Sequence, residues 1–337
     1  MHWLVRRAII SFATIFTAIT ITFFIAVAEP INPIQALASQ MVYQYHMSWS
    51  EAYSIAKTMA PFIPKGSPLQ QYVQYIVNFF RGKLGVSISV ATGVPVIVIL
   101  AHAIPWTVLV VGTALFISFG LGTLAGMFMA YRHGSKLDSG LIVVFSVLRS
   151  IPNYVLALLL LIYLGFQLGW FPVRGNIDIN GILALKHGNI LGFLADVLWH
   201  ATLPILSWVI TSVGWWALVM RGSTISVLGE DFVLYAKARG LPERRITTTY
   251  IGKNAILPIF TLLMISIGFM FGGAVIIEKI FAYPGMGYYM YQAVINKDIY
   301  LMMGAFDVII IAVIVSLFVA DLAYGFLDPR IRRGGPA

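Results

Sequence analysis

The sequence contains no cysteine, few charged residues and no low-complexity tract. Without cysteine, no disulfide, thiolate metal site or cysteine nucleophile is possible. Asp, Glu, Lys and Arg make up 10% of the 337 residues, whereas soluble globular proteins carry about 25%. So few charges cannot coat a water-facing surface of this size, and 59% of the residues are hydrophobic. The composition therefore predicts an integral membrane protein.

The signatures of nucleotide binding and of common hydrolases are also missing. The Gly-Lys pairs at 82–83 and 252–253 lack the earlier glycine and the following hydroxyl residue of a P-loop. No His-Glu-x-x-His metal motif and no Gly-x-Ser-x-Gly elbow occurs. We therefore expect no catalytic residue, no metal site and no cofactor bound by this chain.

The net charge of +9 does not indicate nucleic-acid binding. Lys and Arg occur in short clusters between apolar runs, which is the distribution that membrane topology requires. No stripe of interleaved aromatic and basic residues is present. Nucleic acid is therefore not an expected partner.

Six apolar runs are long enough to cross a bilayer core at about 20 residues each. The first exceeds the apolar core of a signal peptide, about 7–15 residues, so we interpret it as a retained anchor helix. The expected fold class is an all-α integral membrane protein with six transmembrane helices. The runs cover residues 8–28, 104–131, 141–170, 197–220, 254–277 and 302–324.

The distribution of basic residues predicts the orientation, because short cytoplasmic loops are enriched in Lys and Arg. One side carries thirteen of the 22 basic residues and the other side eight, four of them in one long loop. Both termini are therefore predicted to be cytoplasmic. The thirteen basic residues on the predicted cytoplasmic side are Arg6, Arg7, Arg132, Lys136, Arg221, Lys237, Arg239, Arg244, Arg245, Lys253, Arg330, Arg332 and Arg333.

The chain divides into four expected parts. Residues 1–30 form the N-terminal anchor helix and residues 31–101 an extracytoplasmic segment. Residues 102–327 form a core of five transmembrane helices with a cytoplasmic loop at 229–253, and residues 328–337 are a cytoplasmic tail. The amphipathic stretch "LQQYVQYIVNFF" in the extracytoplasmic segment predicts one or two short helices, partly interfacial.

The cytoplasmic loop contains the stretch "DFVLYAKARGLPERR", residues 231–245. Ala236 and Gly240 are four residues apart and would share one helix face, where small residues permit close contact with a partner. Gly240 is expected to end this helix, Pro242 to begin a second one, and Glu243 to lie in its first turn. The stretch predicts a rigid helix–bend–helix, with an ordinary solvated loop as the alternative.

With "NAILP" at residues 254–258, this stretch resembles the EAA loop of ABC-importer permeases. The long gap from Gly240 to Pro258 resembles the oligopeptide, dipeptide and nickel branch. Four further segments resemble the branch in the same order: "FRGKLGVSIS", "SIPNYVLALLLLIYL", "IFAYPGMGYYMYQAVINKDIYLMMG" and "ADLAYGFLDPRIR". In the first of these segments, Lys83 stands where the branch usually has an acid. The last segment, near the C-terminus, is similar to that of the first of two paired permeases.

The resemblance implies a non-catalytic permease subunit in the cell membrane that forms half of a solute pathway. Implied partners are a sister permease subunit, two cytoplasmic subunits that bind ATP and Mg, an extracytoplasmic substrate-binding protein and the lipid bilayer. Peptides, oligosaccharides and nickel all remain open as substrates. The implied residues of coupling to the ATPase are Tyr235, Ala236, Ala238, Arg239, Gly240, Leu241, Glu243 and Arg244.

Two charged residues within apolar runs are candidates for the substrate pathway. Arg149 lies about nine residues into the third run, where a charge usually faces a cavity or a partner. The alternative is that its long side chain reaches the lipid headgroups. Asp307 would either line the outer mouth or be structural, and Asp321 is expected to pair with a cytoplasmic arginine.

Two other classes of function compete with this interpretation. A stand-alone secondary transporter or channel would need intramembrane acids for ion coupling, and only Asp307 and Asp321 are available. A membrane scaffold without transport activity is the third possibility.

Overall fold

The computed structural model describes residues 2–28, 33–59 and 67–327, and every named element in these ranges is helical. Five helical segments are long and apolar enough to cross a membrane, and a sixth is present if one bent pair forms a single span. The expected all-helical fold with six spans is consistent with that count. The predicted tail at 328–337 lies outside the described residues. The five helical segments that could cross a membrane are Leu4–Ala28, Val96–Tyr131, Ile190–Leu228, Glu243–Ile280 and Ile299–Leu322.

The chain packs as two compact units, each made of residues that fold mainly against one another. The first unit contains residues 1–108 and 268–337, so it joins the beginning of the chain to its end. Its helices are α1 (His2–Ala28), α2 (Pro33–Tyr45), α3 (Trp49–Met59), α4 (Pro68–Phe80), α5 (Val96–Thr107), α14 (Val275–Ile280), α15 (Met286–Ile295) and α16 (Ile299–Leu327).

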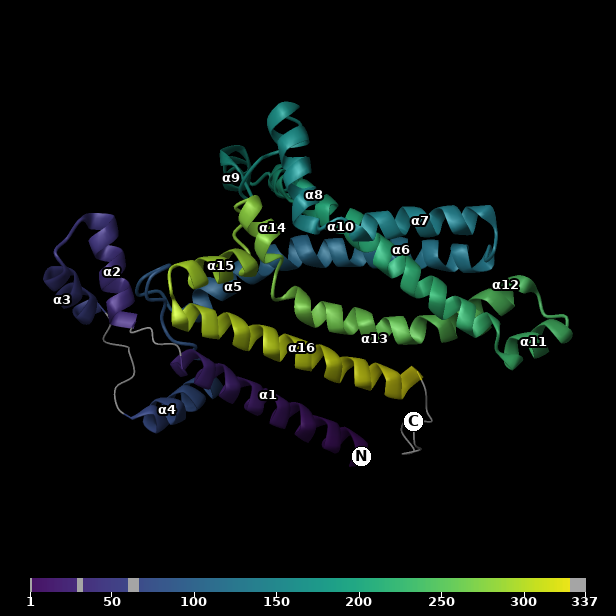
Figure 1. Ribbon diagram of the computed structural model, residues 1–337, viewed down its shortest axis with the longest axis horizontal. Helices are drawn as coiled ribbons and strands as arrows, with labels where there is room; N and C mark the ends of the chain where they lie inside the picture. The colour runs from purple at the N-terminus through teal and green to yellow at the C-terminus, as the bar shows by residue number, and fades with distance from the viewer. Residues whose placement is uncertain (1, 29–32, 60–66, 328–337) are drawn as a thin grey trace. The chain divides into compact units, whose positions relative to one another are not determined.

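In the first unit, α1 and α16 lie side by side (Figure 1). Arg7 near the start of α1 and Asp321 near the end of α16 form an ion pair at 3.0 Å. The expected partner of Asp321 is thus confirmed as Arg7. Because this pair joins opposite ends of two chain segments, the two helices are antiparallel, and their predicted cytoplasmic ends are close together.

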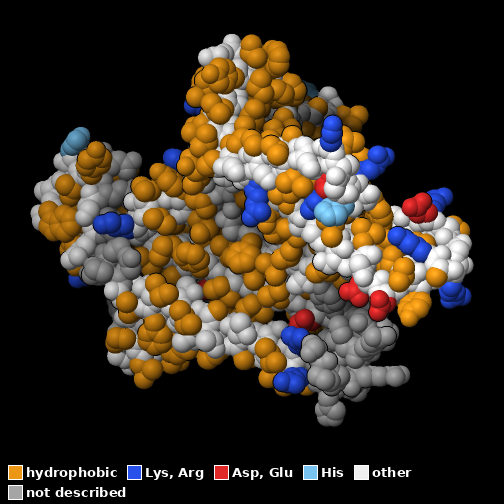
Figure 2. Space-filling model, turned by 45° about the vertical axis from the view of Figure 1, so that its right-hand side comes forward, with side chains coloured by type: hydrophobic (Ala, Val, Ile, Leu, Met, Phe, Trp, Pro, Cys, Tyr) orange, Lys and Arg blue, Asp and Glu red, His pale blue; other side chains and the backbone are white. Residues whose placement is uncertain are grey.

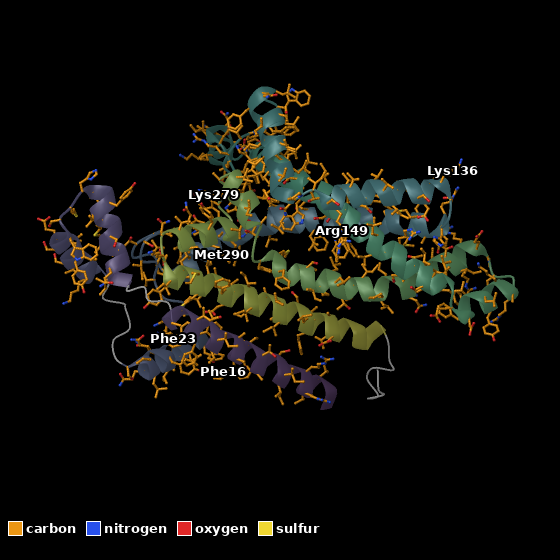
Figure 3. All side chains as sticks on the ribbon, in the orientation of Figure 1. Phe16, Phe23, Lys136, Arg149, Lys279 and Met290 are labelled. Atoms are coloured by element: carbon orange, nitrogen blue, oxygen red, sulfur yellow. The ribbon has the colours of Figure 1, made fainter. Side chains whose placement is uncertain are left out.

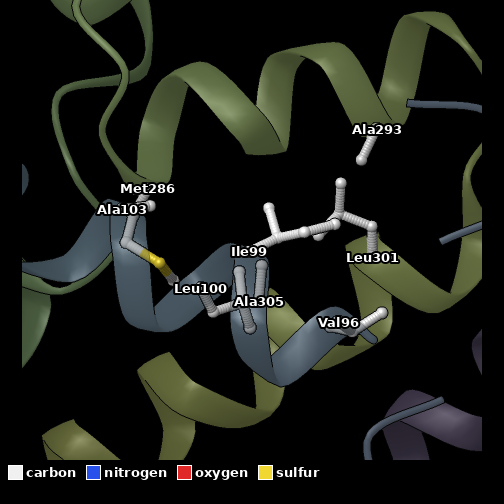
Figure 4. Packing of buried hydrophobic residues seen from close by; sticks show 8 residues of the cluster. All are labelled: Val96, Ile99, Leu100, Ala103, Met286, Ala293, Leu301 and Ala305. Atoms are coloured by element: carbon white, nitrogen blue, oxygen red, sulfur yellow. The ribbon is translucent and has the colours of Figure 1, made fainter. Parts of the chain in front are cut away.

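A buried apolar cluster joins α5, α15 and α16 within the same unit (Figure 4). The side chains of Leu100, Met286 and Leu301 have no exposed surface. Gly304 of α16 permits this close packing, since a Cβ there would lie 2.5 Å from a methyl group of Val96. α5, α15 and α16 therefore share one continuous apolar core.

The second unit contains residues 109–267. α10 is its longest helix and packs against α6 and α7 (Figure 1). Three π-helical segments, η1 (Val108–Gly112), η2 (Leu161–Gln167) and η3 (Ile246–Gly252), continue the helices of the chain. The helices are α6 (Thr113–Tyr131), α7 (Lys136–Ser150), α8 (Asn153–Leu160), α9 (Ile179–Lys186), α10 (Ile190–Leu228), α11 (Asp231–Ala238), α12 (Glu243–Arg245) and most of α13 (Lys253–Met270).

The predicted third span, residues 141–170, is not one straight helix. α7 ends at Ser150, and the segment Asn153–Gln167 continues at an angle of 83°. Ile151 has an extended backbone, with φ −78° and ψ 120°, as residues before proline usually do. Pro152 therefore separates the two helices, although the apolar composition continues through the break.

Apolar side chains cover much of the face shown in Figure 2, and charged side chains are sparse on it. Many large apolar residues of the candidate spans are exposed, among them Phe12 and Ile25 of α1 and Leu124 of α6. Such surface is unfavourable in water and favourable in lipid. This distribution supports the membrane location expected from composition.

Candidate functional site: the loop between α10 and α13

The charged stretch between α10 and α13 folds as a helix, a sharp bend and a second helix, as expected. α11 has Asp231 in its first turn and Lys237 in its last, so both charges suit the helix dipole. Gly240 follows at φ +69°, a left-handed conformation that glycine adopts without strain. Its N–H donates to Lys237 O at 2.9 Å and closes the end of the helix.

The second helix of the loop is short and continues into η3. The expectation that Pro242 is the first residue of α12 was wrong: α12 begins at Glu243, and Pro242 is its N-cap, with φ −56° and a non-helical ψ of 135°. The N–H groups of Arg245 and Ile246 donate to Pro242 O at 2.8 and 3.1 Å. Proline thus fixes the direction in which the chain leaves the bend.

The inner face of the loop is a small apolar core. Val233 and Ala236 of α11 are buried against Ile246 and Ile251 of η3. Leu241 packs at the edge of this cluster, and its N–H donates to Ala236 O at 3.3 Å. The small side chain of Ala236 therefore permits close packing within the loop itself, so a partner could contact the loop only at other residues.

The outer face of α11, made of Leu234, Tyr235, Ala238 and Arg239, is exposed to solvent. Leu234 is 67% exposed and Tyr235 is 69% exposed, although both side chains are largely apolar. Gly240, Glu243 and Arg244 are exposed beside them. Apart from the neighbours of Gly240 in the chain, no residue that the structure describes lies within 4 Å of a Cβ placed there. The loop thus presents an apolar centre with a charged rim.

The loop is attached to a rigid pair of helices. Trp216 and Met220 of α10 pack against Ala255 and Ile259 of α13. The Ser223 hydroxyl donates to Ala255 O at 2.7 Å, between the same two helices. A force on the loop would therefore reach α10 and α13 together.

Glycines bring α6 into close contact with α10. A Cβ on Gly126 would collide with the backbone O of Ala217 and lie 2.8 Å from Met220 Cβ. A Cβ on Gly122 would collide in the same way with Trp216. Gly122 and Gly126 form a Gly-x-x-x-Gly motif, which could have predicted this contact from the sequence, because small residues let membrane helices approach closely.

An ion pair joins α10 to the start of α7, and sequence reasoning did not find it. Arg221 donates to both carboxylate oxygens of Asp138, through Nε and Nη2, at 2.7 Å each. Asp138 is 2% exposed and also accepts the Gly134 N–H at 3.1 Å. His133 Nδ1 lies 3.0 Å from Arg221 Nη2 and 3.4 Å from Asp138 Oδ2, beside the ion pair. The pair connects residues 83 positions apart in the sequence.

The two candidate pathway residues have different environments. Arg149 lies in the last turn of α7, next to the break before Pro152, and its side chain is exposed (Figure 3). Asp307 is 1% exposed and accepts a hydrogen bond from the Tyr75 hydroxyl at 2.7 Å. Among the described residues, its Oδ1 atom has no hydrogen-bond partner. In this conformation the Asp307 carboxylate is therefore inaccessible to a solute.

Comparison with known protein families matches residues 122–333 to the binding-protein-dependent transport system inner membrane component. The di/tripeptide transport system permease protein DppB of Pseudomonas aeruginosa is 27% identical over 345 residues, which cover 98% of this chain and 99% of that protein. The oligopeptide transport system permease protein AppB of Bacillus subtilis is 27% identical over 333 residues, 98% of each chain. The probable peptide ABC transporter permease protein y4tP of Sinorhizobium fredii is 32% identical over 263 residues, 78% of this chain and 80% of that protein.

These matches cover the helices and the loop described above, and they confirm the resemblance stated from five sequence motifs. The family match covers more than half of the chain and includes α7, α10 and the whole helix–bend–helix loop. The chain therefore belongs to the family of binding-protein-dependent transport system inner membrane components, and it is a non-catalytic permease subunit of an ABC importer.

Proposed function

We propose that this chain is the first of two paired permeases in an importer of short peptides. The observation that carries the proposal is the full-length similarity to permeases named for di/tripeptide and oligopeptide transport. Oligosaccharides, which the sequence left open, have no support in the names of these relatives. Nickel also lacks such support.

The proposed partners are a sister permease, an extracytoplasmic binding protein and two cytoplasmic subunits that bind ATP and Mg²⁺. This chain would hold no cofactor of its own. The adjacent exposed side chains of Leu234 and Tyr235 support docking of an ATPase, because a contiguous apolar patch with a polar rim is typical of an interaction site. Arg239, Glu243 and Arg244 would lie at its rim.

In the proposed cycle, closure of the ATPase subunits moves the loop, and α10 and α13 move with it. Arg149 is exposed beside the bend at Pro152, and we propose that it meets the carboxylate of a passing peptide. An arginine is suited to this role because its guanidinium binds carboxylates through two parallel hydrogen bonds. The buried Asp307 is better suited to a structural role.

The proposal is tested by uptake into proteoliposomes that contain the complete importer. With binding protein and ATP present, labelled di- and tripeptides should accumulate, and labelled maltotriose and nickel should not. A second preparation without the ATP-binding subunits should show no uptake. Peptide uptake in that second preparation would contradict the importer and support a stand-alone transporter. ATP-driven uptake of maltotriose or nickel alone would contradict the peptide assignment and leave the importer intact.

A further inference from the structure

Asp298, directly before α16, has no exposed surface and is held by hydrogen bonds from a distant part of the chain. Its Oδ2 atom accepts the N–H groups of residues 88–90 at 3.0–3.1 Å. The Ser87 hydroxyl donates to the same oxygen at 2.5 Å, and the Leu301 N–H donates to Oδ1 at 3.2 Å. These hydrogen bonds connect the sequences "GVSIS" and "NKDIY", which belong to two of the motifs that resemble the peptide branch.

Residues 85–95, which we call the clasp, fold around this carboxylate. The Ser87 N–H donates to Val94 O at 2.9 Å and closes the clasp on itself. The Ser89 hydroxyl donates to Asn296 O at 2.8 Å, beside Asp298. A buried carboxylate is costly unless donors surround it, so this set of donors fixes where the clasp lies on the outer end of α16.

The clasp holds α2 and α3, which together with residues 46–48 we call the outer arm. Ile88 is 1% exposed and packs between Leu37 of α2 and Ala56 of α3, in one buried cluster. Tyr300, in the first turn of α16, packs against the same cluster. The backbone N–H of Ile88 is bound to Asp298 and its side chain to the arm, so Asp298 determines how the arm is attached to α16.

The end of the outer arm where α2 meets α3 is an exposed aromatic tip. Tyr43 is 88% exposed, Tyr45 is 63% exposed and Trp49 is 50% exposed. Residues 41–50 contain no Asp, Glu, Lys or Arg. α2 and α3 lie beyond the outer ends of α1 and α16 (Figure 1), outside the apolar spans. Tyrosine and tryptophan are enriched and charged residues are depleted at the centres of protein–protein interfaces.

We propose that the aromatic tip is a contact of this chain with the extracytoplasmic binding protein, and that Asp298 is the positioning residue that holds the tip in place. The inference rests on the proposed function, which supplies this partner. The matching face of the binding protein is apolar at its centre, with hydrogen-bond acceptors for the tyrosine hydroxyls and the tryptophan N–H. Docking then acts on a part of the chain that is fixed to α16.

The test measures ATP hydrolysis by the complete importer in nanodiscs as the concentration of binding protein loaded with a tripeptide is raised. Tyr43→Ser combined with Trp49→Ser removes the aromatic surface without touching the clasp. The concentration that gives half of the maximal rate should rise about tenfold or more, as for the loss of interface hot spots. The maximal rate should change little, because the membrane core and the loop that faces the ATPase are unchanged.

Asp298→Leu leaves the donors of the clasp without an acceptor and should raise the half-maximal concentration to a similar extent. Asp298→Asn keeps one acceptor oxygen, so its value should lie between those of Asp298→Leu and the wild type. Adding the two tip substitutions to Asp298→Leu should cause little further rise, because a misplaced tip contributes nothing more. Asp307→Asn is the matched control, since the donor of that buried acid is Tyr75 of α4, and it should behave as wild type.

An unchanged half-maximal concentration in the tip variant would overturn the proposal, because the aromatic side chains would then face water or lipid headgroups. Additive effects of the tip and Asp298 substitutions would exclude positioning of the tip by Asp298. An equal rise in Asp307→Asn would also exclude it, because any disturbance of α16 would then have the same effect. A wild-type importer that does not respond to the binding protein would instead contradict the proposed function itself.

Discussion

At the scale of single residues, Gly240 determines how the loop between α10 and α13 turns. Its φ of +69° would cost another residue about 1–2 kcal/mol, and asparagine less than most. Apart from its chain neighbours, no described residue has an atom within 4 Å of a Cβ at this position. The conformation and the space around Gly240 therefore impose two separate constraints, which different substitutions can distinguish.

Gly240→Asn should retain most of the uptake, since asparagine tolerates the left-handed conformation. Gly240→Val should lose part of it through backbone strain. Gly240→Trp should lose more, with ATP hydrolysis continuing, because its bulk would also prevent an ATPase subunit from docking. Uptake and ATP hydrolysis are measured on the same proteoliposomes. Equal losses for Val and Trp would argue that strain alone acts and that no partner approaches Gly240.

Arg149 is the residue for which the pathway role can be separated from a role in membrane anchoring. Arg149→Ala should lower peptide-stimulated ATP hydrolysis several-fold, because the site for a substrate carboxylate is lost. Arg149→Lys keeps the charge without the bidentate geometry and should recover only part of the activity. Full activity of the lysine variant would instead support anchoring to lipid headgroups, and unchanged transport by the alanine variant would remove Arg149 from the pathway.

The residue scale also shows which side-chain roles can be predicted from sequence. The bend at Gly240 and Pro242 depends on local backbone chemistry, so it was predictable. The ion pair between Asp138 and Arg221 was not, because 83 positions separate the two residues and nothing in the local pattern pairs them. The orientation of Ala236 was also undetermined, since helical spacing groups residues on a face but does not say which face is buried.

At the scale of elements, α10 is held on two sides by short-range contacts. Gly122 and Gly126 let α6 approach its backbone, and Arg221 connects it to the start of α7. α11 begins at Asp231, just after α10 ends at Leu228. The ion pair is therefore well placed to keep α10 and α7 together when the loop moves.

Asp138→Asn should lower the melting temperature of the purified importer, because Arg221 would keep its charge in a largely buried site. Removing one partner of such an ion pair leaves the other charge without its counter-charge, which is destabilising. Arg221→Lys should have a smaller effect, since one of the two hydrogen bonds remains possible. Thermal unfolding followed by tryptophan fluorescence checks both variants. A melting temperature unchanged in Asp138→Asn would mean that the pair contributes little.

The outer face of α11 gives a prediction with a control on the inner face. Leu234→Asp places a charge at the centre of the proposed contact, so it should weaken copurification of the ATP-binding subunits more than tenfold. The loop core should remain folded, since Leu234 is 67% exposed. Ala236→Asp puts the same charge into the buried core and should instead destabilise the subunit itself. Normal copurification of the Leu234 variant would exclude this face from docking.

The existence of the spans was predictable from apolar composition, but their full lengths and the breaks within a run were not; α10 has 39 residues, and the predicted run 197–220 covers only part of it. Residues 141–170 are apolar on both sides of Pro152, so counting residues gave one span where the structure has a bend of 83°. The dipeptide Ile151–Pro152 is the signal for that bend, since proline disfavours the α conformation of the residue before it.

At the scale of the whole molecule, the two units differ in how many stretches of the sequence they contain. The second unit is continuous in sequence, whereas the first unit combines residues 1–108 with residues 268–337. The family and the membrane location were predictable, because motifs and composition extend over the full length. The division into two units depends on long-range contacts and was not apparent from the sequence.

Cross-linking checks the predicted topology of the first and last spans. Arg7→Cys combined with Asp321→Cys should form an intramolecular cross-link with a short bifunctional reagent, because the native side chains are 3.0 Å apart. Ile25→Cys combined with Asp321→Cys should not, since Ile25 lies about 27 Å farther along α1 at helical rise. Cross-linking of the second pair would contradict the antiparallel arrangement of α1 and α16.

The pairing of α1 with α16 also has a consequence during biosynthesis. The helix made first finds its neighbour only after some 270 further residues have been translated, by the bounds of the two helices. Until then, Arg7 lacks its native partner Asp321, and α1 must persist in the membrane without this neighbour. Ribosome stalling or a nonsense mutation before residue 299 would therefore leave α1 without α16 and Arg7 without its counter-charge.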